Sequence, residues 1–278
     1  MLKKRIITAV CLVTVFLLDL LLLPSAWFYS LVALVILVAA WEWSDLSGFT
    51  HKCQRIAYCA LALLASIGLL HFVGVSNGFS YPKLNADNVL TVLTTAGVWW
   101  AIALLWIQGY PSSAVLWGSR WIRLVMGLFV LLPCLVGIFY LYQQPFGTWL
   151  ILWVAAIVST ADIFAYFSGR AFGRRKLAKE VSPGKSWEGV MGGVLACIVL
   201  AFAVSYFADK NLLLTLLIVV PTAFSSVLGD LLESMVKRHR GIKDSGSILP
   251  GHGGVMDRID GLTAAIPIFA LALAISNG

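Results

Sequence analysis

Long apolar runs recur along the chain, and each is bounded by proline, glycine or charged residues. Each run is close to the roughly 20 residues that a helix needs to cross a bilayer, and none alternates as barrel strands do. The pattern therefore predicts an all-α, polytopic membrane protein of about nine transmembrane helices. The runs lie near residues 6–23, 26–46, 55–74, 88–107, 121–142, 147–169, 189–208, 211–236 and 261–276.

The composition supports a membrane location. Of the 278 residues, 60% are hydrophobic and 12% are charged, and the mean hydropathy is +0.91. A soluble domain carries about 25% charged residues. The chain therefore has too little polar surface to coat a water-soluble particle.

The lysines and arginines predict the orientation. If the N-terminus is inside and the helices alternate, only Lys83 and Lys210 of the 20 basic residues fall outside. Because basic residues concentrate in cytoplasmic loops, we expect a cytoplasmic N-terminus and a cytoplasmic polar face. The net charge of +7 then favours lipid or other anionic partners, and no basic stretch interleaved with aromatics indicates nucleic acid.

Charge is uneven along the chain, which suggests two regions. Residues 1–160 are nearly all hydrophobic span, whereas residues 161–261 hold most of the charge. We expect N-terminal transmembrane helices over residues 1–145. A C-terminal catalytic region with cytoplasmic loops is expected over residues 146–278.

Two acidic residues lie within predicted spans. Asp162 precedes Arg170 by eight residues, about 12 Å along a helix, and Asp230 lies seven residues before Lys237. Carboxylates at such depth are costly and usually functional, although a hydrogen bond between helices would also explain Asp162. Glu233 shares a helical face with Asp230 and Lys237, and a simple Glu233–Lys237 pair accounts for it.

The segment 241–261 is rich in glycine, with six glycines among 21 residues. Such a loop can bring backbone N–H groups close to an anion. His252, Asp257, Arg258 and Asp260 lie in or next to it, which suggests a hydrated metal–phosphate site. A solvated connector would also explain the composition.

Gly184-Lys185-Ser186 is similar to the end of a phosphate-binding P-loop. That motif requires glycine at position 179, which is Lys179, and no strand is expected before it, so a P-loop is rejected. A Pro-Gly turn and a helix start at residues 185–188 are expected instead. Lys185 can still hold a phosphate as a point charge.

Other chemistries lack their motifs. No HExxH is present for a catalytic zinc, no GxSxG for a serine hydrolase, and no CxxC pair among the five cysteines, which we expect to be reduced. Trp41-Glu42-Trp43 lies at a predicted helix end. We interpret it as part of the aromatic belt, without a catalytic role.

Residues 234–260 read SMVKRHRGIKDSGSILPGHGGVMDRID. This segment resembles the signature of the phosphatidate cytidylyltransferase family, S-x-x-K-R-x4-K-D-x-G followed by P-x-H-G-G-x-x-D-R-x-D, at every fixed position. Residues 182–189 and 228–234, and Asp162 with Tyr166, also resemble the family. The resemblance covers about the C-terminal 120 residues strongly, and the N-terminal spans resemble the family mainly in hydropathy and around Trp41-Glu42-Trp43. Ser186 stands where many members have threonine.

The resemblance implies a reaction in which phosphatidate and CTP give CDP-diacylglycerol and pyrophosphate, with Mg²⁺ required. It places the enzyme in a bacterial cytoplasmic (inner) membrane and leaves a homodimer open. No protein nucleophile is needed, because the lipid phosphate attacks. The implied catalytic residues are Asp230, Asp257, Lys237 and Arg258, the metal ligands are Asp230, Asp257 and Asp162, and the substrate-binding residues are Ser182, Lys185, Ser234, Arg238, Lys243 and His252.

Three other functions would each explain part of the sequence. An ion- or proton-coupled transporter would use Asp162 and Asp230, but it leaves the basic, glycine-rich loop unexplained. Phosphotransfer from CDP-diacylglycerol to an alcohol needs a DG-x2-AR pattern, and Asp260-Gly261 is not followed by Ala-Arg. A non-catalytic scaffold would tolerate the loss of Asp257.

Overall fold

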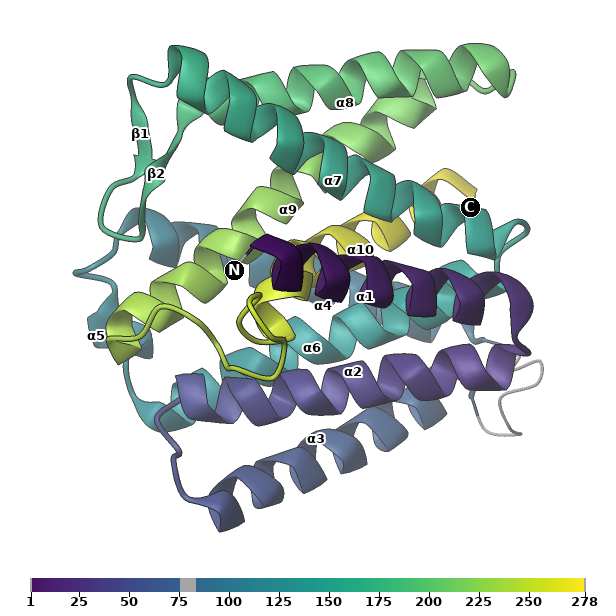
Figure 1. Ribbon diagram of the computed structural model, residues 1–278. Coiled ribbons are helices and arrows are strands. Elements are labelled where there is room, and N and C mark those ends of the chain that lie inside the picture. Colours follow the sequence, from purple (N-terminus) through teal and green to yellow (C-terminus); the bar gives the residue numbers. More distant parts are fainter. Residues whose placement is uncertain (1, 76–83, 278) are drawn as a thin grey trace.

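The computed structural model describes residues 2–75 and 84–277 as an assembly of helices with one small hairpin (Figure 1). Eight helices are long and apolar enough to cross a membrane, and α1 adds a shorter apolar stretch, Val10–Leu22. The predicted polytopic all-α fold is therefore confirmed over the described residues. The helices are α1 (Leu2–Leu22), α2 (Ser25–Leu46), α3 (Lys52–Phe72), α4 (Ala86–Gln108), α5 (Ala114–Trp117), α6 (Arg120–Gln143), α7 (Gly147–Phe172), α8 (Trp187–Phe207), α9 (Leu212–Arg240) and α10 (Met256–Asn277).

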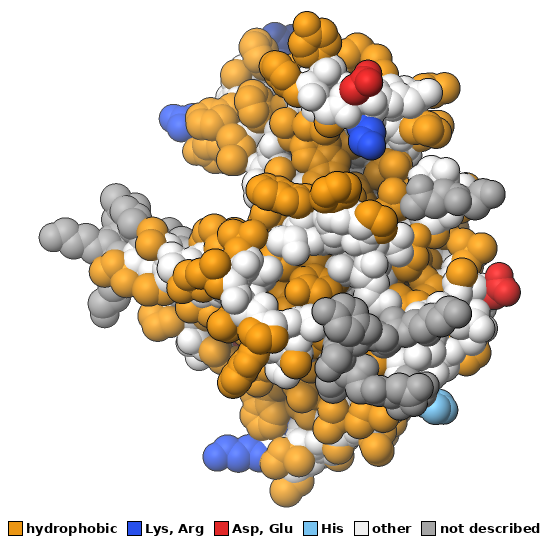
Figure 2. All heavy atoms as spheres, turned by 90° about the vertical axis from the view of Figure 1, so that its right-hand side faces the viewer, with side chains coloured by type: hydrophobic (Ala, Val, Ile, Leu, Met, Phe, Trp, Pro, Cys, Tyr) orange, Lys and Arg blue, Asp and Glu red, His pale blue; other side chains and the backbone are white. Residues whose placement is uncertain are grey.

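The loops predicted to lie inside gather at one end of the assembly. The α2–α3 link, α5, the hairpin after α7 and the α9–α10 loop all lie at the left in Figure 1, near the start of α1. The opposite end, which Figure 2 faces, is covered largely by hydrophobic side chains and carries few charges. This arrangement agrees with the alternation deduced from basic residues, although Lys83 lies outside the described residues.

A two-stranded antiparallel hairpin precedes α8. It consists of β1 (Lys176–Ala178) and β2 (Ser182–Ser186), so the expectation that no strand precedes Gly184-Lys185-Ser186 is wrong. The expected Pro-Gly turn is also wrong, because Pro183 and Gly184 lie within β2. The helix start is as expected, and the Ser186 side chain caps α8 by accepting a hydrogen bond from the Gly189 N–H at 3.1 Å. Lys179 still occupies the position of the first P-loop glycine, so that motif stays excluded.

Small residues let the C-terminal helices approach closely. A Cβ atom at Gly193 of α8 would lie 2.5 Å from the Ala161 carbonyl oxygen of α7, and one at Gly229 of α9 would clash with the Asp260 carbonyl oxygen of α10. Close backbone approach at small residues is how helices commonly associate in membranes. These contacts hold α8 against α7 next to Asp162, and α10 against α9 next to Asp230.

The helix α10 joins the two halves of the chain. It packs against α9 and α7, and also against α4 and α6. The N-terminal and C-terminal helices therefore share one packed interior. The boundary at residue 145 stays a prediction.

Candidate active site

A cavity of about 470 Å³ opens between α7, α8, α9 and the hairpin. It brings together residues that are up to 68 positions apart in the sequence, from Asp162 to Asp230. Two carboxylates and two cations thus face one space. The polar residues that line it are Asp162, Tyr166, Arg170, Ser182, Lys185, Ser186 and Asp230.

Asp230 is held from two sides. The Lys185 ammonium lies 2.5 Å from its Oδ2 atom, and the Ser234 hydroxyl donates to Oδ1 at 3.2 Å. The side chains of Lys185 and Asp230 remain 26% and 33% exposed. The pair is therefore accessible from the cavity, and its charges can be redistributed when an anion or a cation binds.

Lys237 forms a buried charge cluster between α9 and α10. Its ammonium lies 3.2 Å from Glu233 Oε2 and 2.6 Å from Asp257 Oδ1. The side chains of Lys237, Glu233 and Asp257 are only 9%, 0% and 6% exposed. Buried charges persist only when paired, so Lys237 holds both carboxylates in place. The expected Glu233–Lys237 pair is present, and Asp257 extends it.

Asp257 also fixes the α9–α10 loop. Its Oδ2 atom accepts from the Gly254 N–H at 2.8 Å and the Ser245 N–H at 2.9 Å. With Oδ1 held by Lys237, both carboxylate oxygens have protein partners. Asp257 lines neither this cavity nor the loop cavity described below.

The three predicted metal ligands are divided by the fold. Asp162 and Asp230 line the same cavity, whereas Asp257 is bonded to Lys237 and the loop. Within residues 2–75 and 84–277, no group of three or more His, Cys, Asp or Glu side chains is arranged to hold a metal ion. A metal role for Asp257 therefore stays a prediction, and it requires some of these bonds to open.

A second, more polar cavity of about 600 Å³ lies within the α9–α10 loop. Lys243 and His252, which are predicted to bind substrate, line it together with Arg258, a predicted catalytic residue. The loop turns back on itself at Gly253, whose φ of +81° favours glycine, and Leu249 and Gly253 form a bridge. This cavity offers cationic groups and backbone to an anion.

Arg238 lies outside both cavities. Its guanidinium donates to the carbonyl oxygen of Val181 at 3.3 Å and to that of Ile242 at 3.4 Å. It thereby ties the hairpin to the α9–α10 loop. Its predicted contact with substrate stays a prediction.

Glu42 of α2 lies beneath the α9–α10 loop, a position that the sequence did not reveal. It is 1% exposed, its Oε1 accepts from the Val255 N–H at 3.0 Å, and its Oε2 accepts from the Met256 N–H at 2.7 Å. These donors lie at the start of α10, where the helix dipole favours an anion. The Ser245 hydroxyl lies between Glu42 Oε2 at 3.1 Å and Asp257 Oδ2 at 3.0 Å.

Two glycines of the loop pack directly against the Glu42 carboxylate. A Cβ atom at Gly246 would lie 2.5 Å from Glu42 Oε1, and one at Gly254 would lie 2.5 Å from Oε2. The loop is therefore folded around this buried carboxylate. The sequence signal is an acid within an apolar run, but its tryptophan neighbours are equally typical of an aromatic belt.

The model of the cytidylyltransferase family matches residues 3–276. This chain belongs to that family. The match includes the N-terminal helices, whose resemblance to the family lies mainly in hydropathy.

Several relatives of the family have similar lengths. The Pseudomonas aeruginosa protein named phosphatidate cytidylyltransferase is 47% identical to this chain over 276 residues. The matched region covers 98% of this chain and 97% of the relative. The Haemophilus influenzae protein of that name is 38% identical over 283 residues (97% and 98%). The Brucella melitensis protein is 32% identical over 291 residues (99% and 94%).

Proposed function

We propose that the chain transfers CMP from CTP to phosphatidate, which gives CDP-diacylglycerol and pyrophosphate for phospholipid synthesis. The observation that carries this proposal is the cavity where Asp162, Lys185 and Asp230 meet at the polar end of a membrane-spanning assembly. The nearly full-length relatives named phosphatidate cytidylyltransferase support it. Neither observation favours a transporter.

The reaction joins two anions. A phosphate oxygen of phosphatidate attacks the α-phosphorus of CTP, a new P–O bond forms, and the bond to the pyrophosphate leaving group breaks. Cationic side chains placed where charge develops stabilise such a transition state. Lys185 supplies such a charge in the first cavity. Lys243 and Arg258 line the loop cavity, where they can hold a further phosphate group. The lipid phosphate is the nucleophile, so no side chain has to form a covalent intermediate.

The acidic residues of the first cavity fit a magnesium ion. Mg²⁺ is commonly bound through one or two carboxylates together with substrate phosphates, and Asp162 and Asp230 are two carboxylates that line one cavity. When bound, the ion would neutralise phosphate charge. Lys185 would then share Asp230 with the ion or turn toward a phosphate.

The location is part of the proposal. We place the protein in the bacterial cytoplasmic membrane with the active site facing the cytoplasm. The clustering of basic loops at one end of the assembly supports this orientation, and CTP is a cytoplasmic solute. A homodimer stays a prediction, which the mass of the purified particle tests.

The function is tested with the full chain in lipid nanodiscs. We expect pyrophosphate release and CDP-diacylglycerol formation in equal amounts, only when CTP and phosphatidate are both present. Asp230→Asn should lower turnover by about 10²-fold or more, the size of effect seen when one electrostatic group of an active site is removed. Pyrophosphate release without phosphatidate would contradict the proposal.

A matched control is Asp209→Asn. Asp209 lies in the α8–α9 turn with a φ of +50°, which asparagine tolerates, and it is remote from both cavities. Its turnover should stay within about twofold of the wild type, as is usual for surface substitutions. For the metal, Mn²⁺ binding followed by electron paramagnetic resonance should weaken in Asp162→Asn and Asp230→Asn, but not in Asp209→Asn.

A further inference from the structure

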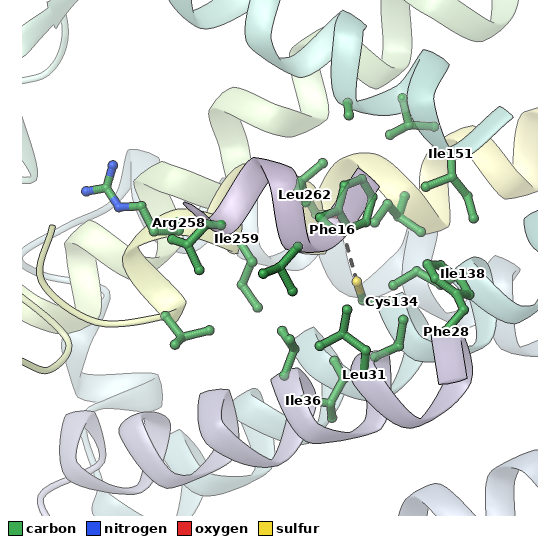
Figure 3. A pocket seen from close by; sticks show the side chains of 18 of the residues that line it. Phe16, Phe28, Leu31, Ile36, Cys134, Ile138, Ile151, Arg258, Ile259 and Leu262 are labelled. Carbon is green, nitrogen blue, oxygen red and sulfur yellow. Dashed lines mark hydrogen bonds between the residues drawn. The ribbon is translucent and has the colours of Figure 1, made fainter. Parts of the chain in front are cut away.

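An almost wholly apolar cavity lies among α1, α2, α6, α7 and α10 (Figure 3). Its volume is about 310 Å³, at the lower end of the range for ligand sites. Side chains such as Phe16, Leu31 and Ile138 line it, and nothing in the lining would hold ordered water in its interior. Apolar cavities of this kind stay dry and accept hydrocarbon.

One charged residue contributes to the lining. Figure 3 shows Arg258 at one end, with its guanidinium directed away from the apolar side chains. Within the described part of the chain, this guanidinium forms no ion pair with a carboxylate. It is therefore free to bind an external anion.

The apolar cavity adjoins the polar loop cavity. Leu249 and Arg258 line both of them. The loop cavity adds Lys243 and His252 on the polar side. The first helix closes over this junction, since the Thr8 hydroxyl donates to the Pro250 carbonyl oxygen at 3.2 Å. Together the two cavities suit a molecule with an anionic head and a hydrocarbon tail.

We propose that the apolar cavity takes one acyl chain of phosphatidate, with the lipid phosphate held at Arg258. This inference rests on the proposed function, since it names where the lipid substrate of that reaction binds. The volume suits a segment of one chain and is too small for two. The second chain is then left among the bilayer lipids.

The bilayer changes what such a cavity can do. Lipid tails are as apolar as the cavity wall, so a chain gains little hydrophobic free energy by moving from one to the other. The cavity therefore discriminates among chains by shape and length. Filling it should slow the reaction of long-chain phosphatidate selectively. The binding of CTP should be unchanged.

The variant Ala155→Phe tests this, because Ala155 of α7 lines the cavity. Ala156→Phe is its matched control, since the neighbouring Ala156 lines none of the three cavities described here. For Ala155→Phe we expect kcat/KM for dioleoyl phosphatidate to fall roughly tenfold, the lower end of what a methylene-sized misfit causes. Dihexanoyl phosphatidate should lose less than about twofold, within the range of a neutral change. Equal losses with both lipids, or none with either, would overturn the proposal.

A binding experiment without CTP separates this proposal from the proposed function. Phosphatidate with a diazirine on one chain is photolysed in nanodiscs with the wild type and both variants. We expect labelled peptides from α2 and α6. Dioleoyl phosphatidate should compete with the label, whereas dioleoyl phosphatidylcholine should not. Among the proteins tested, only Ala155→Phe should lose the label. Label confined to exposed apolar residues such as Leu195 of α8 would refute binding in the cavity. Competed label without turnover would instead refute the proposed function.

Discussion

Replacing Glu42 by glutamine removes a charge from beneath the α9–α10 loop while keeping the size of the side chain. Glu42 accepts from the backbone N–H groups of Val255 and Met256 through different oxygens. Glutamine has a single carbonyl oxygen, so its NH₂ group must face one of these donors. The variant therefore loses one charge-assisted hydrogen bond. It also places the glutamine NH₂ group against a backbone N–H group, two buried donors with no acceptor between them.

The magnitude follows from that count. A hydrogen bond to a charged group contributes about 1.5–3 kcal/mol, and 1.4 kcal/mol corresponds to a factor of ten in an equilibrium. The equilibrium between the folded and the open loop should thus shift by roughly 10- to 150-fold. The helices keep their own packing, so the helical circular dichroism of the variant should match that of the wild type.

Hydrogen exchange measured by mass spectrometry reads this shift directly. We expect amides of residues 243–256 to exchange at least about tenfold faster in Glu42→Gln, while the exchange of α6 amides is unchanged. We also expect turnover to fall, because the folded loop no longer holds Lys243, His252 and Arg258 in position. Glu180→Gln, at an exposed position in the hairpin turn, is the matched control. Unchanged loop exchange in Glu42→Gln would refute the argument that this carboxylate holds the loop.

Other substitutions test neighbouring contacts. Lys237→Met leaves two buried carboxylates without a cation and should destabilise the protein by about 3–5 kcal/mol, which thermal unfolding in nanodiscs measures; an unchanged midpoint would contradict the cluster. Glu233→Gln keeps the Lys237–Asp257 bond, so its turnover should fall far less than that of Asp257→Asn, and equal losses would place Glu233 in the reaction itself. Gly254→Ala forces a Cβ atom against the Glu42 carboxylate and should speed loop exchange as Glu42→Gln does; additive effects in the double variant would show that the two do not act together.

The fold was largely predictable because of how membranes constrain a chain. Runs of about 20 apolar residues can cross a bilayer only as helices, so the long helices were foreseen within a few residues. The hairpin before α8 was missed because its strands are only three and five residues long. The second of them contains Pro183 and Gly184, two residue types that strands disfavour.

The sequence could predict only those site residues that local spacing or the family resemblance indicates. Asp162, Lys185 and Asp230 do share a cavity, but the bonds that occupy Asp257 could not be read from its sequence position. Glu42 reaches partners 203–214 residues away. No local pattern encodes a contact of that separation, so its role became visible only in three dimensions.

The central claim is that both substrates meet at the polar end of the assembly and that the lipid phosphate attacks CTP directly. The most direct measurement uses CTP that carries a sulfur of known configuration at the α-phosphorus, followed by stereochemical analysis of the thio-CDP-diacylglycerol formed. A single displacement predicts inversion at that phosphorus. Retention would contradict the account, because it requires a CMP-enzyme intermediate and hence a nucleophilic side chain.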